Sequence, residues 1–133
     1  MALDFNMPVL VVDDYRTMVR IIRNFLNQLG FADVDGASDG GAALKMMHEK
    51  DYGLVISDWN MEPMTGYELL REVRADDHLS QTPFIVVTAG AKSETGAETE
   101  TVARTAGASN YLLKPFNAVT LRSKIEALFG DGA

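Results

Sequence analysis

Five polar residues stand directly after apolar runs of the chain, and together their types could support one kind of chemistry. Asp13 and Asp14 follow the first run, Asp58 the second, Thr88 the third and Lys114 the fourth. Each one alone is more often a turn residue, a helix cap or a solvated charge. Short apolar runs that end in turn signals are typical of buried strands, and parallel strands present their carboxyl ends at one rim. We therefore expect three carboxylates, a hydroxyl and an ammonium group to meet in one crevice.

Such a crevice favours phosphoryl transfer with an aspartate as the nucleophile. Carboxylates packed together resist ionisation unless a cation lies among them. Because no His or Cys is nearby, these oxygen ligands suit Mg²⁺ or Mn²⁺, and phosphate oxygens commonly complete the shell of Mg²⁺. Lys114 would supply a second positive charge that attracts a phosphoryl group or a carboxylate, and Thr88 would donate a hydrogen bond to the same group. Asp58, where a buried run meets a turn closed by Pro63 and Gly66, is the expected reactive residue.

Strand and helix patterns alternate along the chain and would position these residues. Strand patterns cover 9–12, 31–37 as an edge strand, 54–58, 84–87 and 111–113. Helical patterns cover 15–29, a helix capped by Ser38 or Asp39, a helix from 66 to near 76, the second half of 90–106, and 119–129. Connections of this length join parallel strands through helical crossovers. We predict an α/β fold with a five-stranded parallel sheet and helices on both faces, although the pattern alone does not give the strand order.

The apolar positions of two helices can be stated in advance. On the first helix they are Met18, Ile21, Ile22, Phe25 and Leu29, and on the last they are Val119, Leu121, Ile125, Leu128 and Phe129. We expect these side chains to face the sheet.

The composition is that of one globular domain. The chain has 133 residues, of which 47% are hydrophobic and 23% charged, which is enough to bury a core. The absence of cysteine excludes disulfides, thiolate metal sites and thiol nucleophiles. A net charge of -7 disfavours nucleic acid as a partner. No apolar run approaches the length of a membrane span and no signal pattern is present, so we expect a cytoplasmic protein without membrane association.

Four segments carry motifs in a recognisable order: 11–14 (VVDD), 56–61 (ISDWNM), 87–89 (VTA) and 111–116 (YLLKPF). Together they resemble the receiver domain of two-component response regulators, and most closely the single-domain chemotaxis regulators of the CheY type. The resemblance covers essentially the whole chain, 1–133, as a single domain with its core at about 8–129. It implies the doubly wound (βα)5 flavodoxin-like fold with strand order 2-1-3-4-5.

The resemblance also implies a role for each residue of the crevice. Asp58 would accept a phosphoryl group from a phosphohistidine on a histidine kinase or histidine phosphotransfer domain. Asp14 and Asp58 would bind Mg²⁺ or Mn²⁺ with the backbone carbonyl of Asn60, and Asp13 would act mainly through a metal-bound water. Lys114 would contact the acceptor carboxylate and then the phosphoryl oxygens.

Switching is the second implication of the resemblance. Thr88 would move towards the new phosphoryl group and the ring of Tyr111 would turn inward behind it. This would change the face built from the fourth helix, the fifth strand and the fifth helix, where an output protein docks; the flagellar motor switch is one candidate. A cis bond between Lys114 and Pro115 is expected, and nothing in the sequence requires more than a monomer.

The chain departs from the family pattern in the stretch 90–101. Thr88 and Lys114 are 26 positions apart, a few more than the family usually shows. The glycines and threonines of this stretch predict a long mobile loop and a short or displaced fourth helix. Gly90 leaves the lifetime of the phosphoryl group open, and Trp59, beside the site, should be a partly exposed reporter.

Alternatives within and outside this function class remain at this point. Within it, a phosphate sink or a phosphorelay intermediate would use the same residues, and the sequence names neither the kinase nor the output partner. An aspartate-nucleophile phosphatase would need a general acid where Asn60 stands and a cap over its substrate, which this chain is too short to supply. A structural receiver that is never phosphorylated is disfavoured by the complete set of Asp13, Asp14, Asp58, Thr88 and Lys114.

Overall fold

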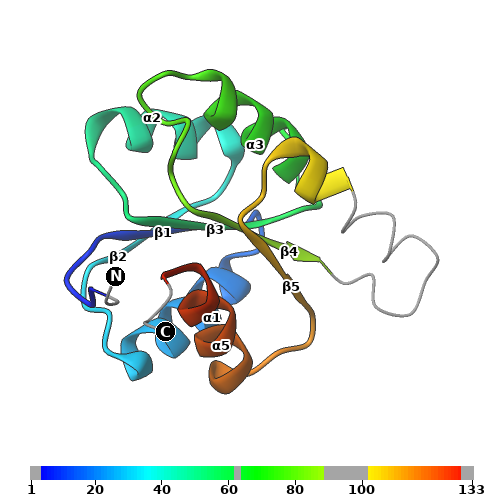
Figure 1. Cartoon of the computed structure of the whole chain (residues 1–133). Coiled ribbons are helices and arrows are strands. Elements are labelled where there is room, and N and C mark those ends of the chain that lie inside the picture. Colours follow the sequence, from blue (N-terminus) through cyan, green and yellow to red (C-terminus); the bar gives the residue numbers. More distant parts are fainter. Residues whose placement is uncertain (1–3, 62–63, 89–101, 130–133) are drawn as a thin grey trace.

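The protein is a five-stranded parallel sheet covered by helices on both faces (Figure 1). The computed structural model describes residues 4–61, 64–88 and 102–129. The sheet order is β2-β1-β3-β4-β5, which confirms the predicted fold and strand order. The strands are β1 (Val9–Val12), β2 (Val34–Ala37), β3 (Leu54–Asp58), β4 (Phe84–Thr88) and β5 (Asn110–Leu113). All four residues of β1 and all five of β3 and of β4 are buried, as expected for strands covered on both faces.

The helices form two layers. Helices α2 (Gly40–Glu49) and α3 (Gly66–Ala75) lie on one face of the sheet, and α1 (Arg16–Leu29) and α5 (Ala118–Phe129) lie on the other (Figure 1). Residues 102–106 are also helical and lead into β5. Each layer closes its own hydrophobic cluster, with Leu10, Val55 and Val86 in one and Val11, Ile56 and Val87 in the other. Successive side chains of the central strands therefore pack into opposite hydrophobic clusters, one on each face of the sheet. Among the described residues no helix is long and apolar enough to cross a membrane.

Side-chain caps fix where two helices begin. Of the two caps proposed for α2 it is Asp39 that acts, because its carboxylate accepts a hydrogen bond of 2.7 Å from the Ala42 N–H. Thr65 and Glu68 form a reciprocal capping box at the start of α3. Such caps satisfy amide groups that have no partner inside the helix. They hold the loops that follow β2 and β3 at the carboxyl edge of the sheet.

The predicted apolar faces of α1 and α5 contain two errors. Ile21 is 37% exposed and Val119 is 75% exposed. In α1 the buried stripe instead runs through Ile22 and Leu26, which lie one turn apart on the same face, whereas Ile21 is rotated away from it. The edge strand is also shorter than expected, since it starts at Val34 rather than at residue 31. The loop and helix start predicted for 90–101 lie outside the described residues.

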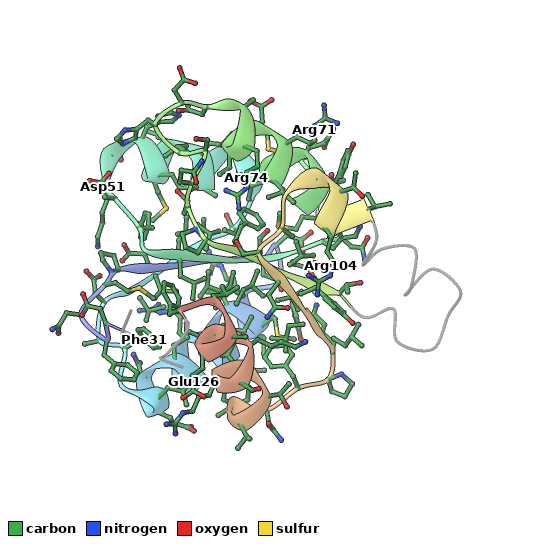
Figure 2. All side chains as sticks on the ribbon, viewed as in Figure 1. Phe31, Asp51, Arg71, Arg74, Arg104 and Glu126 are labelled. Atoms are coloured by element: carbon green, nitrogen blue, oxygen red, sulfur yellow. The ribbon has the colours of Figure 1, made fainter. Side chains whose placement is uncertain are left out.

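One half-buried arginine, Arg74 at the end of α3, ties this helix to the approach to β5. Figure 2 labels this arginine among the side chains of the α2 and α3 layer. Arg74 donates hydrogen bonds to the carbonyl oxygens of Ser80, Thr82 and Gly107, at 3.0, 2.7 and 2.9 Å. Burial lowers the pKa of its guanidinium group. Because Ser80 and Thr82 precede β4 and Gly107 precedes β5, Arg74 fixes the entry into β4 relative to the entry into β5.

Candidate functional site

Three carboxylates meet at the carboxyl edge of the sheet. Asp13 follows β1, Asp14 is next to it, and Asp58 is the last residue of β3. Each offers an oxygen, and these oxygens all lie within 4.8 Å of one another. Asp13 and Asp58 are buried, at 2% and 6% exposure, while Asp14 is exposed. The arrangement brings together the acidic residues that the sequence analysis singled out.

The local backbone holds Asp13 in a fixed orientation. Its N–H donates to the Ala37 carbonyl at 3.1 Å, which extends the pairing of β1 with β2. Its Oδ1 accepts a hydrogen bond of 2.9 Å from the Tyr15 N–H. Its Oδ2 is buried and has no hydrogen-bond partner among the described residues. A buried oxygen without a partner is unfavourable, so this atom is oriented for a ligand.

Lys114 brings a positive charge to the same place from β5. Its Nζ lies 3.0 Å from Oδ1 of Asp58 and 4.0 Å from Oδ2 of Asp13. Its backbone N–H donates to the Thr88 carbonyl at 2.8 Å, so the ladder between β4 and β5 sets the starting point of the side chain. The Lys114–Pro115 peptide bond is cis, which confirms the prediction.

Burial shifts the protonation of the two enclosed carboxyl groups. Desolvation raises the pKa of Asp13 to about 6, partly opposed by the Tyr15 N–H, and the charge of Asp58 raises it further. Desolvation also raises the pKa of Asp58, against the lowering effect of Lys114. A cation among these groups would favour their charged forms. One ammonium group is too little charge for three carboxylates, and the site is electrostatically suited to a further cation.

The turn after Asp58 depends on a close backbone approach. The Trp59 N–H donates to the Val87 carbonyl at 2.8 Å, and the Gly66 N–H donates to the Trp59 carbonyl at 2.9 Å. A Cβ on Gly66 would lie 2.8 Å from the Cα of Trp59, so only glycine fits here. The Trp59 side chain is half-buried, as expected, and its ring packs edge-on against Tyr67 at 5.7 Å. Asn60 is exposed beside this turn, and its role as a carbonyl ligand stays a prediction.

Thr88 lies on β4, the strand next to that of Asp58, and Tyr111 lies on β5, one strand further along the sheet. Thr88 is the last residue of β4 and is 3% exposed, and it is paired in register with Leu113. Tyr111 lies two residues earlier on β5 and is half-buried. Lys124 Nζ lies 4.8 Å from the centre of its ring and the Arg104 guanidinium 5.3 Å. The placement is compatible with a path from the site through β5 to α5.

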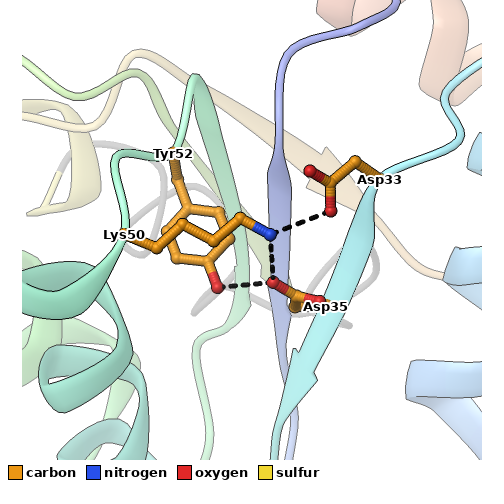
Figure 3. A network of polar contacts seen from close by, with 4 residues as sticks. All are labelled: Asp33, Asp35, Lys50 and Tyr52. Atoms are coloured by element: carbon orange, nitrogen blue, oxygen red, sulfur yellow. Dashed lines mark hydrogen bonds and ion pairs between the residues drawn. The ribbon is translucent and has the colours of Figure 1, made fainter.

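The sequence analysis assigned no role to two groups of charged residues. Arg16, Arg20 and Arg23 line a groove beside Asp13, and their spacing on one helix face was the available signal. On the other side of β2, Lys50 Nζ lies 2.9 Å from Asp33 and 3.0 Å from Asp35 (Figure 3). The second group bridges β2 to the turn before β3 and lies outside the site.

Comparison with known proteins gives one family. The model of the response regulator receiver domain matches residues 9–126. The chain is 46% identical to a chemotaxis protein CheY of Pseudomonas aeruginosa over 123 residues, covering 92% of this chain and 96% of that protein. It is 43% identical to a chemotaxis protein CheY-3 of Vibrio cholerae over 127 residues, covering 96% and 95%.

Solved structures show the same fold. The chemotaxis response regulator CheY4 of Vibrio cholerae superposes with a TM-score of 0.82 at 32% identity, covering 92% of this chain and 98% of that one. A receiver domain of a sensor histidine kinase from Pseudomonas aeruginosa superposes with a TM-score of 0.81 at 26% identity, covering 94% and 98%. That structure is described as having a magnesium ion coordinated in its active-site cleft.

Proposed function

Because this chain belongs to the response regulator receiver domain family, we propose that it is a phosphorylation-controlled switch of a two-component chemotaxis system in which Asp58 is the acceptor. The observation that carries the proposal is the contact between Lys114 Nζ and Asp58 Oδ1, at 3.0 Å, beside Oδ2 of Asp13, which accepts no hydrogen bond from the described residues. A buried carboxylate with a lysine on one oxygen and further acidic groups alongside is equipped to accept a phosphoryl group from a phosphoramidate or an acyl phosphate.

The transfer would proceed at the carboxylate of Asp58. One of its oxygens forms a bond to phosphorus while the bond between phosphorus and the donor histidine nitrogen breaks, and the electron pair of that bond returns to the imidazole. Lys114 stabilises the negative charge on the phosphoryl oxygens during the transfer. A small phosphodonor such as acetyl phosphate would react at the same oxygen, and water would later hydrolyse the aspartyl phosphate.

The residues present fit a divalent metal ion. Asp13, Asp14 and Asp58 offer oxygens within 4.8 Å of one another, and Oδ2 of Asp13 accepts no hydrogen bond from the described residues. Hard oxygen ligands of this kind suit Mg²⁺ or Mn²⁺. With the backbone carbonyl of Asn60 these residues would hold the ion, which supplies charge neutralisation for the phosphoryl oxygens.

The switch would run from the site into β5 and α5. A phosphoryl group adds about 1.5 to 2 negative charges at one point. The hydroxyl group of Thr88 and the ammonium group of Lys114 bind the new phosphoryl oxygens. The ring of Tyr111, which is two residues before Leu113, the partner of Thr88 in the sheet, then takes a new position behind them. Such a change biases a pre-existing equilibrium between two states of the face formed by residues 102–106, β5 and α5.

A histidine kinase or histidine phosphotransfer domain is the proposed donor, and an output protein, with the flagellar motor switch as one candidate, is the proposed receiver of the signal. The chemotaxis names of the relatives at 43% and 46% identity support this role. We propose a single receiver domain spanning 1–133 that acts as a cytoplasmic monomer. A phosphate sink or a relay intermediate would use the same chemistry, and the lifetime of the aspartyl phosphate separates them.

Trp59 fluorescence tests the proposal directly. The wild type, Asp58→Asn and the exposed control Asp77→Asn would each receive Mg²⁺ and then acetyl phosphate, and intact mass would count bound phosphoryl groups. We expect Mg²⁺ to change the signal in the wild type and the control, and acetyl phosphate to change it again in both. Asp58→Asn should gain no phosphoryl group.

Two outcomes would contradict the proposal. Equal phosphorylation of Asp58→Asn would place the acceptor elsewhere. Failure of acetyl phosphate and of a phosphohistidine donor protein to modify the wild type would leave a metal site without phosphoryl chemistry. If phosphorylation occurs, its decay after donor removal distinguishes a fast signal from a slower relay.

A further inference from the structure

A groove beside the site concentrates positive charge that the proposed function does not use. It lies between α1 and the carboxyl end of β2 and has a volume of about 370 Å³. Helix α1 lines it with Arg16, Val19, Arg20 and Arg23. The other wall is Gly36 and Ala37 of β2 with Ser38, which follows the strand, and Asp13 lies at one end. The groove is therefore separate from the acceptor carboxylate, with Asp13 as the shared boundary.

The three arginines form a stripe along one face of α1. Positions i, i+4 and i+7 of a helix lie above one another, and seven residues span roughly 10 Å. All three side chains are exposed. Within the described part of the chain none of them forms a hydrogen bond or an ion pair, although the charge of Arg23 contributes to the low pKa of Asp35. By contrast, Arg71 and Arg122 both have side-chain partners, Tyr67 and Glu126.

The floor of the groove is bare backbone. Gly36 is exposed and has no side chain, and a Cβ there would lie 2.8 Å from Cγ1 of Val19. It belongs to β2, which is an edge strand of the sheet. The outer side of an edge strand presents backbone N–H and C=O groups that an added extended chain can use. A cation-lined wall and an edge of this kind favour an elongated ligand over a compact one.

We propose that this groove binds an acidic, extended segment of a partner protein, with the carboxylates of that segment paired to Arg16, Arg20 and Arg23. The planar fork of a guanidinium group matches a carboxylate in two parallel hydrogen bonds. Charge complementarity supports an acidic ligand, because three cations that have no hydrogen bond or ion pair with the described residues line the same groove. A nucleic acid carries many more negative charges than a short acidic segment, so the net charge of -7 opposes it more strongly. Binding here does not depend on phosphorylation of Asp58.

The test uses a labelled peptide of alternating Glu and Ser, with the Gln–Ser peptide of equal length as its neutral counterpart. Two-dimensional NMR of the full chain should show shifts on α1 and at Gly36–Ser38 with the acidic peptide only. The Arg16→Gln, Arg20→Gln, Arg23→Gln triple variant should raise the dissociation constant by at least about threefold, since exposed ion pairs are individually weak and three of them are lost together. Added salt should weaken binding by the wild type.

A charge-matched control separates a local site from the effect of net charge. The Lys45→Gln, Arg71→Gln, Arg122→Gln triple variant loses the same charge from exposed positions elsewhere and should bind like the wild type. Asp58→Asn should also bind normally, which keeps this test independent of phosphoryl transfer. Equal losses in both triple variants, or no shifts at α1 at millimolar peptide, would overturn the proposal. Tighter binding of single-stranded DNA or inorganic phosphate at the same residues would replace the acidic segment with another ligand class.

Discussion

The ammonium group of Lys114 lies 3.0 Å from Oδ1 of Asp58, although 56 positions separate the two residues. The contact exists because β4 lies between β3 and β5 and all three strands end at the same rim. The Lys114 N–H donates a hydrogen bond to the Thr88 carbonyl, so the pairing of β5 with β4 positions Lys114 beside the Asp58 carboxylate. This relationship couples the chemistry at Asp58 to the position of β5.

Replacing Lys114 by Ala should slow phosphorylation of Asp58 by roughly 100-fold, because one preorganised charge at the reacting group is removed. Lys114→Arg keeps the charge but not the position of Nζ and should recover only part of the rate. The measurement is the rate of phosphorylation by acetyl phosphate at saturating Mg²⁺. Lys124→Ala, which removes a lysine whose Nζ lies over the Tyr111 ring, is the control and should phosphorylate at nearly the wild-type rate. A Lys114→Ala rate equal to that of the wild type would remove Lys114 from the chemistry.

The raised pKa of Asp13 predicts how stability without metal depends on pH. The folded-state pKa, about 6, lies above the ordinary value of 3.8, so the folded protein holds this proton more tightly than the unfolded chain. The free energy of unfolding should therefore fall as the pH rises from about 4 through about 6, by roughly 1 to 3 kcal/mol. The pKa of Asp58 is also raised, so its ionisation adds to the fall in the free energy of unfolding. Urea titrations in the presence of a chelator measure it.

Two comparisons identify the source of that pH dependence. Mg²⁺ binding favours the ionised carboxylates, so added Mg²⁺ should oppose the loss of stability above pH 6 and bind weakly below it. Asp13→Asn should flatten the profile and make the metal-free protein more stable at pH 7. A profile that is unchanged in Asp13→Asn would show that other groups cause the pH dependence.

The strands and their polar ends could be predicted because each local pattern agrees with the fold. Continuous apolar runs occur only where a strand is covered on both faces, and β1, β3 and β4 are such strands. Asp13, Asp58 and Lys114 each follow or end a predicted strand, so a parallel sheet had to place all three at the same edge. Parallel pairing makes that inference robust, since it does not depend on side-chain conformation.

Features that depend on register and helix rotation could not be predicted. Arg74 bonds to carbonyl groups that lie 6, 8 and 33 positions further along the chain, and no local pattern marks such acceptors. The contact of Lys50 with Asp35 needs the register of β2 against β1, in which Asp35 pairs with Leu10. Ile21 and Ile22 are adjacent, and the apolar pattern did not decide which of them faces the sheet.

A pair of substitutions in α1 tests which face of the helix is buried against the sheet, through the change that each causes in the free energy of unfolding. Leu26→Ala removes a side chain with 0% exposure and should lower the free energy of unfolding by about 2 to 5 kcal/mol. Ile21→Ala, at 37% exposure, should change it by roughly 1 kcal/mol or less. Urea denaturation of both variants at one pH gives the comparison. Similar losses would mean that α1 is rotated relative to the structure described here.

The network around Lys50 predicts a stability effect that disappears in acid. Tyr52 donates a hydrogen bond of 2.7 Å to Asp35 (Figure 3), and this bond, followed by the contact with Lys50, lowers the pKa of Asp35. Tyr52→Phe should therefore cost about 0.5 to 1.5 kcal/mol at pH 7, a range that allows for the partial exposure of Asp35. A lowered folded-state pKa gives stability that is present above pH 3.8 and is lost as the pH falls through the folded-state value. The difference between wild type and Tyr52→Phe should shrink accordingly below about pH 4. Tyr67→Phe, whose hydroxyl accepts a bond from exposed Arg71, is the matched control and should cost less at every pH. A Tyr52→Phe cost that stays constant down to pH 3 would assign the effect to packing rather than to the charge on Asp35.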